Sequence, residues 1–131
     1  MTTDVAVHEE VVTFADGLPG FESSHRFVLV ASPSLDPFTL LQGMGPDAPS
    51  FVAIDPRQVE PSFAGEAALA DRARLDAAPG APLLWLALVS AHEHAPATVN
   101  LRAPIVINPA SMRGIQIVPA ESPYRLDHPL G

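Results

Sequence analysis

Proline and glycine interrupt this chain so often that long helices and long unbroken strands have little room. Its 131 residues include 15 prolines and 8 glycines, as in the runs Leu18-Pro19-Gly20 and Asp55-Pro56. Because proline lacks a backbone donor and glycine permits turn conformations, this punctuation favours short strands joined by turns. The chain is long enough to bury a core without a metal or a disulfide, so we expect one domain spanning residues 1–131.

Seven segments between the interruptions are rich in β-branched and aromatic residues, as strands are. They are residues 10–14, 26–31, 38–42, 51–54, 83–91, 98–107 and 114–118. Pro104 cannot donate a ladder hydrogen bond, so the sixth segment should lie at a sheet edge there or carry a bulge. The unbroken run Leu83 to Val89 (LLWLALV) predicts a strand that is covered on both faces.

One segment has a helical composition. Residues 65–78 (GEAALADRARLDAA) are rich in helix formers, but only Leu69 and Leu75 are large and apolar. We therefore expect a short helix that covers the side or end of a sheet. Many strands with a single helix predict a mainly β fold, an antiparallel sheet closed into a small barrel or folded into a sandwich.

The charge and the cysteine content exclude several kinds of protein. Cysteine is absent, which excludes disulfides and thiolate metal sites and is typical of a reducing compartment. Fifteen acidic residues against seven arginines and no lysine give a net charge of −8, which repels nucleic acid and suits a basic protein partner. No secretory signal is visible, and the longest apolar run is far shorter than the roughly 20 residues of a membrane-spanning helix. We expect a cytoplasmic protein that binds neither nucleic acid nor membrane.

The sequence gives little support for catalysis or metal binding. His92 and His94 would face one side of a strand and could share a metal, but no further ligand is placed beside them. Ser90 with His92 lacks the context of a nucleophile, and the Gly43 to Pro46 turn lacks the lysine of a phosphate loop. We expect no enzyme activity, no metal and no cofactor. A small metal-dependent β-barrel enzyme using His92 and His94 remains the alternative.

Several motifs occur in a distinctive order along almost the whole chain. The first is Phe14-Ala15-Asp16-Gly17-Leu18-Pro19-Gly20-Phe21-Glu22, followed by Arg26-Phe27. Then come FTLLQ from Phe38, FVAIDP from Phe51, TVNLRAPIVIN from Thr98, GIQIV from Gly114, Tyr124 and finally His128-Pro129-Leu130. This arrangement resembles the FliW family of flagellar assembly factors.

The resemblance implies a barrel-like domain that binds flagellin and, in many bacteria, the RNA-binding translational regulator CsrA. Flagellin that accumulates would occupy the protein and release CsrA to repress flagellin translation. A flagellin-only binding chaperone is a second alternative. Exposed polar and aromatic residues near turns are the candidate contacts with partners: Asp55, Glu60, Phe63, Gln116, Glu121, Tyr124 and Asp127. Phe63 and Tyr124 are the expected anchors, because aromatic residues carry much of the energy of interfaces.

Overall fold

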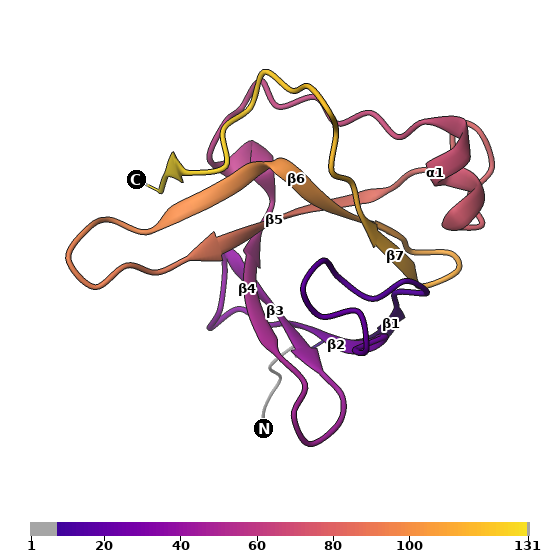
Figure 1. Ribbon diagram of the computed structural model, residues 1–131, viewed down its shortest axis with the longest axis horizontal. Helices are drawn as coiled ribbons and strands as arrows, with labels where there is room; N and C mark the ends of the chain where they lie inside the picture. The colour runs from indigo at the N-terminus through magenta and orange to yellow at the C-terminus, as the bar shows by residue number, and fades with distance from the viewer. Residues whose placement is uncertain (1–7, 131) are drawn as a thin grey trace.

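A computed structural model describes residues 8–130, in which seven strands close into a small barrel (Figure 1). The barrel strands are β1 His8–Thr13, β2 Arg26–Ala31, β3 Phe38–Gly43, β4 Ser50–Ile54, β5 Leu84–Ser90, β6 Thr98–Asn108 and β7 Arg113–Gln116. A two-residue strand, β8 His128–Pro129, pairs with β6. Two short helices, η1 Pro56–Gln58 and α1 Leu69–Arg74, lie between β4 and β5. The predicted mainly β fold is confirmed, and the open choice between barrel and sandwich is decided for the barrel.

One pair of neighbours in the barrel is parallel, which differs from the expected antiparallel sheet. The order around the barrel is β5-β4-β3-β2-β1-β7-β6, and β6 pairs again with β5. An odd number of strands cannot alternate in direction around a closed ring, so one neighbouring pair must be parallel. That pair is β1 and β7, which meet only at Thr13 and Arg113.

The bulge expected near Pro104 is present in β6. Leu86 of β5 pairs with Ile105, whereas Leu88 pairs with Asn100, so residues 101–104 of β6 bulge out of the ladder. The bulge also breaks the regular alternation of faces along β6. Ile105 and Ile107 pack inside the barrel, while Val99 and Leu101 pack in a second cluster.

The barrel interior is filled by large side chains from most of its strands. Phe14 and Phe27 are fully buried and meet edge to face, with ring centroids 5.4 Å apart. The other members of this core are Val12, Leu18, Leu41, Ala53, Leu86, Ile105 and Ile107. Full burial of each large apolar side chain contributes about 1.5–3 kcal/mol, so this cluster is the main source of stability.

The helix is shorter than the sequence predicted, at six residues from Leu69 to Arg74. It begins late because Gly65 lies flat on the Trp85 ring, where a Cβ would stand 2.7 Å from ring atoms. Past its end, Leu75 is fully buried against Val106 and Ile115. The helix therefore covers the side of the barrel at β7, as expected, and the exposed Leu69 adds nothing to that contact.

Candidate functional site

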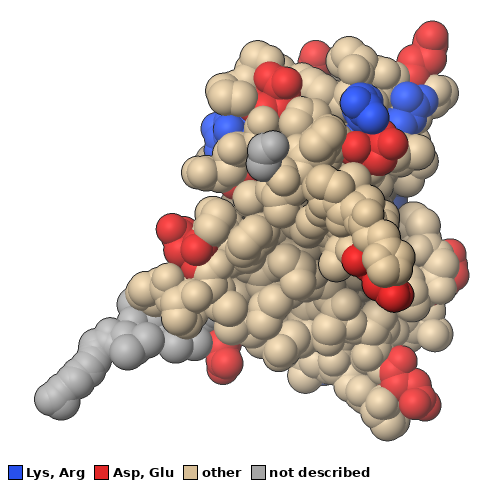
Figure 2. Space-filling model, turned by 90° about the vertical axis from the view of Figure 1, so that its left-hand side faces the viewer, with Lys and Arg blue, Asp and Glu red and all other residues tan. Residues whose placement is uncertain are grey.

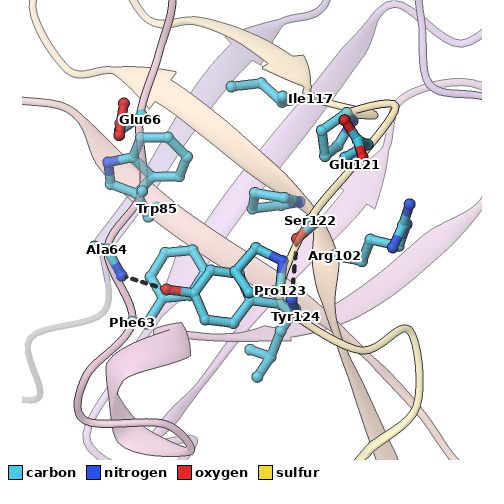
Figure 3. A pocket seen from close by; sticks show the side chains of 14 residues that line it. Phe63, Ala64, Glu66, Trp85, Arg102, Ile117, Glu121, Ser122, Pro123 and Tyr124 are labelled. Atoms are coloured by element: carbon cyan, nitrogen blue, oxygen red, sulfur yellow. Dashed lines mark hydrogen bonds between the residues drawn. The ribbon is translucent and has the colours of Figure 1, made fainter.

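A hollow of about 340 Å³ opens on the outside of the barrel, between the chain before α1 and the chain that follows β7 (Figure 3). Three aromatic residues, Phe63, Trp85 and Tyr124, line it. Its charged lining residues are Glu66, Arg102 and Glu121. We call this hollow, with those six residues, the aromatic groove.

The strand periodicity of β5 places Trp85 in the groove. Leu86, the next residue, belongs to the barrel interior, so Trp85 must point to the outer face. There it packs with Val106, Leu75 and Ile115 and remains partly exposed. The close approach of Gly65 covers part of the indole ring and fixes where the following chain can run.

The three rings form one continuous apolar surface. Phe63 and Tyr124 have centroids 4.8 Å apart, and Phe63 and Trp85 have centroids 6.1 Å apart. Phe63 is only 8% exposed, whereas Tyr124 is partly exposed. The Tyr124 hydroxyl accepts a 2.9 Å hydrogen bond from the Ala64 N–H, which joins the two walls of the groove (Figure 3).

The β6 bulge holds the C-terminal wall of the groove in place. Because residues 101–104 leave the β5 ladder, the N–H groups of Leu101 and Arg102 are available to other acceptors. Both donate to the Arg125 carbonyl, at 3.0 and 3.2 Å. The Arg102 guanidinium donates to the Ala120 carbonyl at 3.1 Å, and its position at the rim is thereby fixed. The bulge caused by Pro104 therefore shapes the groove.

The groove combines apolar rings with two carboxylates and one guanidinium at its rim. Such a surface can bury apolar side chains of a peptide and attract a basic residue beside them. Figure 2 shows another face of the molecule, on which charged side chains stand mostly around the margin and the middle is largely uncharged. A second hollow, beside β8, has no Asp, Glu, Lys or Arg in its lining, which includes Phe38, Ile54, Val59, His128 and Leu130.

Three of the seven predicted contact residues, Phe63, Glu121 and Tyr124, lie together in the groove. The others lie elsewhere. Asp55 caps η1 by accepting from the Arg57 N–H at 2.9 Å and also pairs with the Arg57 side chain. Gln116 donates to the Ala103 carbonyl at 3.0 Å.

Glu60 and Asp127 also make local contacts outside the groove. Glu60 accepts from the hydroxyl and the N–H of Ser62, and these bonds hold the pKa of Glu60 below its ordinary value. Asp127 pairs with Arg125 at 3.1 Å. These contacts lie in turns near the groove and add nothing to its lining.

Sequence reasoning missed Trp85, Glu66 and Arg102 as groove residues. Trp85 stands in a run that predicts a strand covered on both faces, but Leu84 is exposed and the indole is only partly covered. The signal in the sequence was the alternation of strand faces, which places the single tryptophan, Trp85, on the face opposite to Leu86. Nothing local marks Glu66 or Arg102.

The histidines of the metal-site alternative lie in the turn after β5. His92 makes a 2.9 Å hydrogen bond with the Thr98 hydroxyl, and His94 is 3.4 Å from Glu93 with both side chains largely exposed. Among residues 9–130, no group of three or more His, Asp or Glu side chains comes together as a metal site would require.

Residues 2–130 match the sequence profile of the family described as FliW protein. The chain belongs to the FliW family. A flagellar assembly factor FliW from Natranaerobius thermophilus is 36% identical over 97% of this chain and 86% of that protein. One from Caldanaerobacter subterraneus subsp. tengcongensis is 33% identical over 93% of this chain and 83% of that protein.

The fold of this FliW family member agrees with a solved relative. A crystal structure of the flagellar assembly factor FliW superposes with a TM-score of 0.81 at 28% identity, covering 91% of this chain and 84% of that one. Within the described part of the chain, no helix has the length and apolar character needed to span a membrane.

Proposed function

We propose that this chain is a non-catalytic flagellar assembly factor that acts in the cytoplasm by binding flagellin and the translational regulator CsrA. Family membership over residues 2–130 supports the flagellar role, since the relatives are named assembly factors. We further propose that residues 1–131 act as one FliW-like unit without a metal or cofactor.

The observation that carries the binding role is the aromatic groove. Its rings offer an apolar surface that is partly exposed in the free protein, and protein interfaces concentrate binding energy in such aromatic clusters. We assign the groove to an apolar terminal segment of flagellin. Glu66 and Glu121 would favour a segment with a basic residue next to its apolar side chains.

Binding of CsrA fits the charge of the molecule. An RNA-binding regulator needs a basic surface, and a chain of net charge −8 attracts such a surface while repelling RNA. Flagellin and CsrA would then occupy this protein alternately. Free flagellin releases CsrA to repress flagellin translation, and flagellin export reverses the effect. CsrA that is bound to this chain would lose affinity for RNA. If the chain does not touch the RNA site of CsrA, the coupling between the two sites is allosteric.

Co-purification tests the assignment of the groove. Flagellin should be retained by this protein, and flagellin that lacks its C-terminal segment should not. Glu66→Gln with Glu121→Gln should weaken retention slightly, because rim charges contribute little, and Gln58→Ala on η1 serves as a control outside the groove. Undiminished binding of the truncated flagellin would show that another segment is recognised.

Two alternatives give different results in the same assays. A flagellin-only chaperone would retain flagellin but not CsrA from the same bacterium. A metal-dependent enzyme would hold one equivalent of metal after mild purification and lose it on His92→Ala. The exposed positions of His92 and His94 do not favour a metal site.

A further inference from the structure

The outer edge of β1 carries backbone groups that the described fold leaves without a neighbouring strand. β1 and β7 meet only where β1 ends, at Thr13, and β7 begins, at Arg113. Before Thr13, the edge of β1 that faces away from β2 has no strand partner within residues 8–130. Helix α1 lies against β7, the strand on the other side of the β1–β7 junction.

Two hydrogen bonds establish which backbone groups point to the open edge. The Thr13 N–H donates to the Met112 carbonyl at 2.9 Å, away from β2. The Phe14 N–H donates to the His25 carbonyl at 2.7 Å, on the β2 side. Because successive strand residues direct their backbone groups to alternate edges, Glu9 and Val11 share the outward direction of Thr13. Each presents one donor and one acceptor to a strand that could pair there.

The side chains along this edge define a chemical pattern. Glu9, Glu10 and Val11 are exposed, Val11 by 38%, whereas Val12 is fully buried. Glu9 and Val11 lie on one face of the strand and Glu10 on the other. A strand added here would therefore meet a carboxylate on each face and then an apolar β-branched side chain.

This pattern selects between two kinds of occupant. A second copy of the chain, pairing β1 with β1, would bring acidic side chains opposite or diagonal to one another, and like charges there destabilise a ladder. Acidic residues on an edge are a common protection against such self-pairing. A strand carrying basic residues would instead gain a cross-strand ion pair at each carboxylate.

We propose that the outer edge of β1, at residues 9–11, binds an extended segment of a partner protein that carries two consecutive Lys or Arg residues beside a β-branched residue. The segment adds one strand to the sheet, so backbone hydrogen bonds supply affinity and the side chains supply selectivity. This surface shares no residue with the aromatic groove. The proposal therefore does not rest on the function assigned to that groove.

A defined peptide tests this inference with the full chain. The sequence Thr-Thr-Val-Lys-Arg-Val-Thr-Thr satisfies the pattern in either strand direction. In nitrogen-15 spectra at low salt, the peptide should shift the Glu9 and Val11 amide signals and slow their hydrogen exchange. The Glu10 and Val12 amides, which face β2, should change little. A peptide with Glu in place of Lys and Arg, and one N-methylated at alternate residues, should fail to bind.

Variants of β1 separate edge pairing from other binding. Val11→Pro removes an outward N–H without removing a β1–β2 hydrogen bond. It should raise the dissociation constant of the peptide at least about tenfold, whereas Val11→Ala should bind the peptide nearly normally. If Val11→Pro fails to fold, a charge swap replaces it: Glu9→Lys with Glu10→Lys should bind the Glu peptide and reject the Lys-Arg peptide. No detectable binding at millimolar peptide, shifts mapped away from residues 9–11, an ineffective charge swap, or a dimer formed through β1 would each overturn the inference.

Discussion

Phe63 and Tyr124 stack on one another, but they differ in how much surface each exposes. Phe63 is 8% exposed and belongs to the fold, while Tyr124 is partly exposed and can contact a partner. Sequence reasoning treated the two as equivalent anchors because it could see only the residue type. Tyr124 is therefore the residue whose truncation should report on binding, and Phe63 the one whose truncation should report on stability.

Truncation of these two rings should affect different properties, binding for Tyr124 and stability for Phe63. Tyr124→Ala should weaken binding of the flagellin segment by about 2 kcal/mol or more, roughly 30-fold in the dissociation constant, with the fold retained. Phe63→Ala should lower the free energy of unfolding by about 3 kcal/mol. Tyr124→Phe is the matched control and should cost less than about 1 kcal/mol, because water can bond the exposed Ala64 N–H. Calorimetric titration and urea unfolding measure these effects, and unchanged affinity in Tyr124→Ala would remove it from the interface.

Glu60 should stabilise the fold only while it is ionised. Ser62 bonds lower the pKa of this carboxyl below 4.5 in the folded state, so its contribution is present above that value. The contribution is lost as the pH falls through the lowered, folded-state pKa. Glu60→Gln should therefore be less stable than the parent chain at pH 7, and the difference should shrink as the pH falls below 4.5. Urea unfolding at pH 7 and at a series of values below 4.5 measures it. Glu66→Gln is the control, and a difference independent of pH would contradict this role of Glu60.

At the scale of elements, the Asn108 side-chain amide bonds the end of the helix to the barrel. Asn108, 2% exposed, donates to the carbonyls of Leu75 and Asp76 just after α1, each at 3.1 Å. Its side-chain oxygen accepts from the Ala110 N–H at 3.0 Å. A six-residue helix has little stability of its own, so this amide and buried Leu75 hold it on the barrel.

Asn108→Ala should loosen α1 before it unfolds the barrel. Loss of the two hydrogen bonds that the Asn108 amide donates and the one that it accepts should cost about 2 kcal/mol or more. Hydrogen exchange should accelerate at α1 more than in β2 and β3. Ser111→Ala, which removes one bond to the Leu75 carbonyl, should cost less. Equal acceleration throughout the chain would mean that Asn108 supports the whole barrel and not the helix in particular.

The strands were predictable because strand pattern and turn residues agree. Residues 26–31 were predicted as they are found, and the other strands differ by one to a few residues at their ends. The two-residue β8 and the late start of α1 were not predictable, since they depend on distant contacts such as Gly65 against Trp85. The helix η1 is local, because Asp55 caps it, but the sequence indicated only a turn at Asp55-Pro56. Likewise, Phe63 and Tyr124 were chosen by residue type, but their meeting in space follows from the β6 bulge and its bonds to Arg125.

The whole molecule should be steered toward a basic partner. With a net charge of −8, its association rate with CsrA should fall as salt rises toward 0.5 M, because charges are screened over a Debye length of roughly 10 Å at 0.1 M salt. Dissociation should change less. Glu121→Gln with Asp127→Asn should slow association, each change contributing no more than about 1 kcal/mol, and Gln58→Ala should not. Surface plasmon resonance across a salt series measures both rates. An association rate indifferent to salt would exclude electrostatic steering.

The central claim, that the aromatic groove receives a flagellin segment, has a built-in reporter. Trp85 is the chain's single tryptophan and lies in the groove, partly exposed. Titration of a tryptophan-free C-terminal flagellin segment, followed by Trp85 emission, measures occupancy directly. We predict a saturable shift of the emission to shorter wavelength, because the segment replaces water around the indole. Formation of the complex with Trp85 emission unchanged throughout the titration would contradict the account.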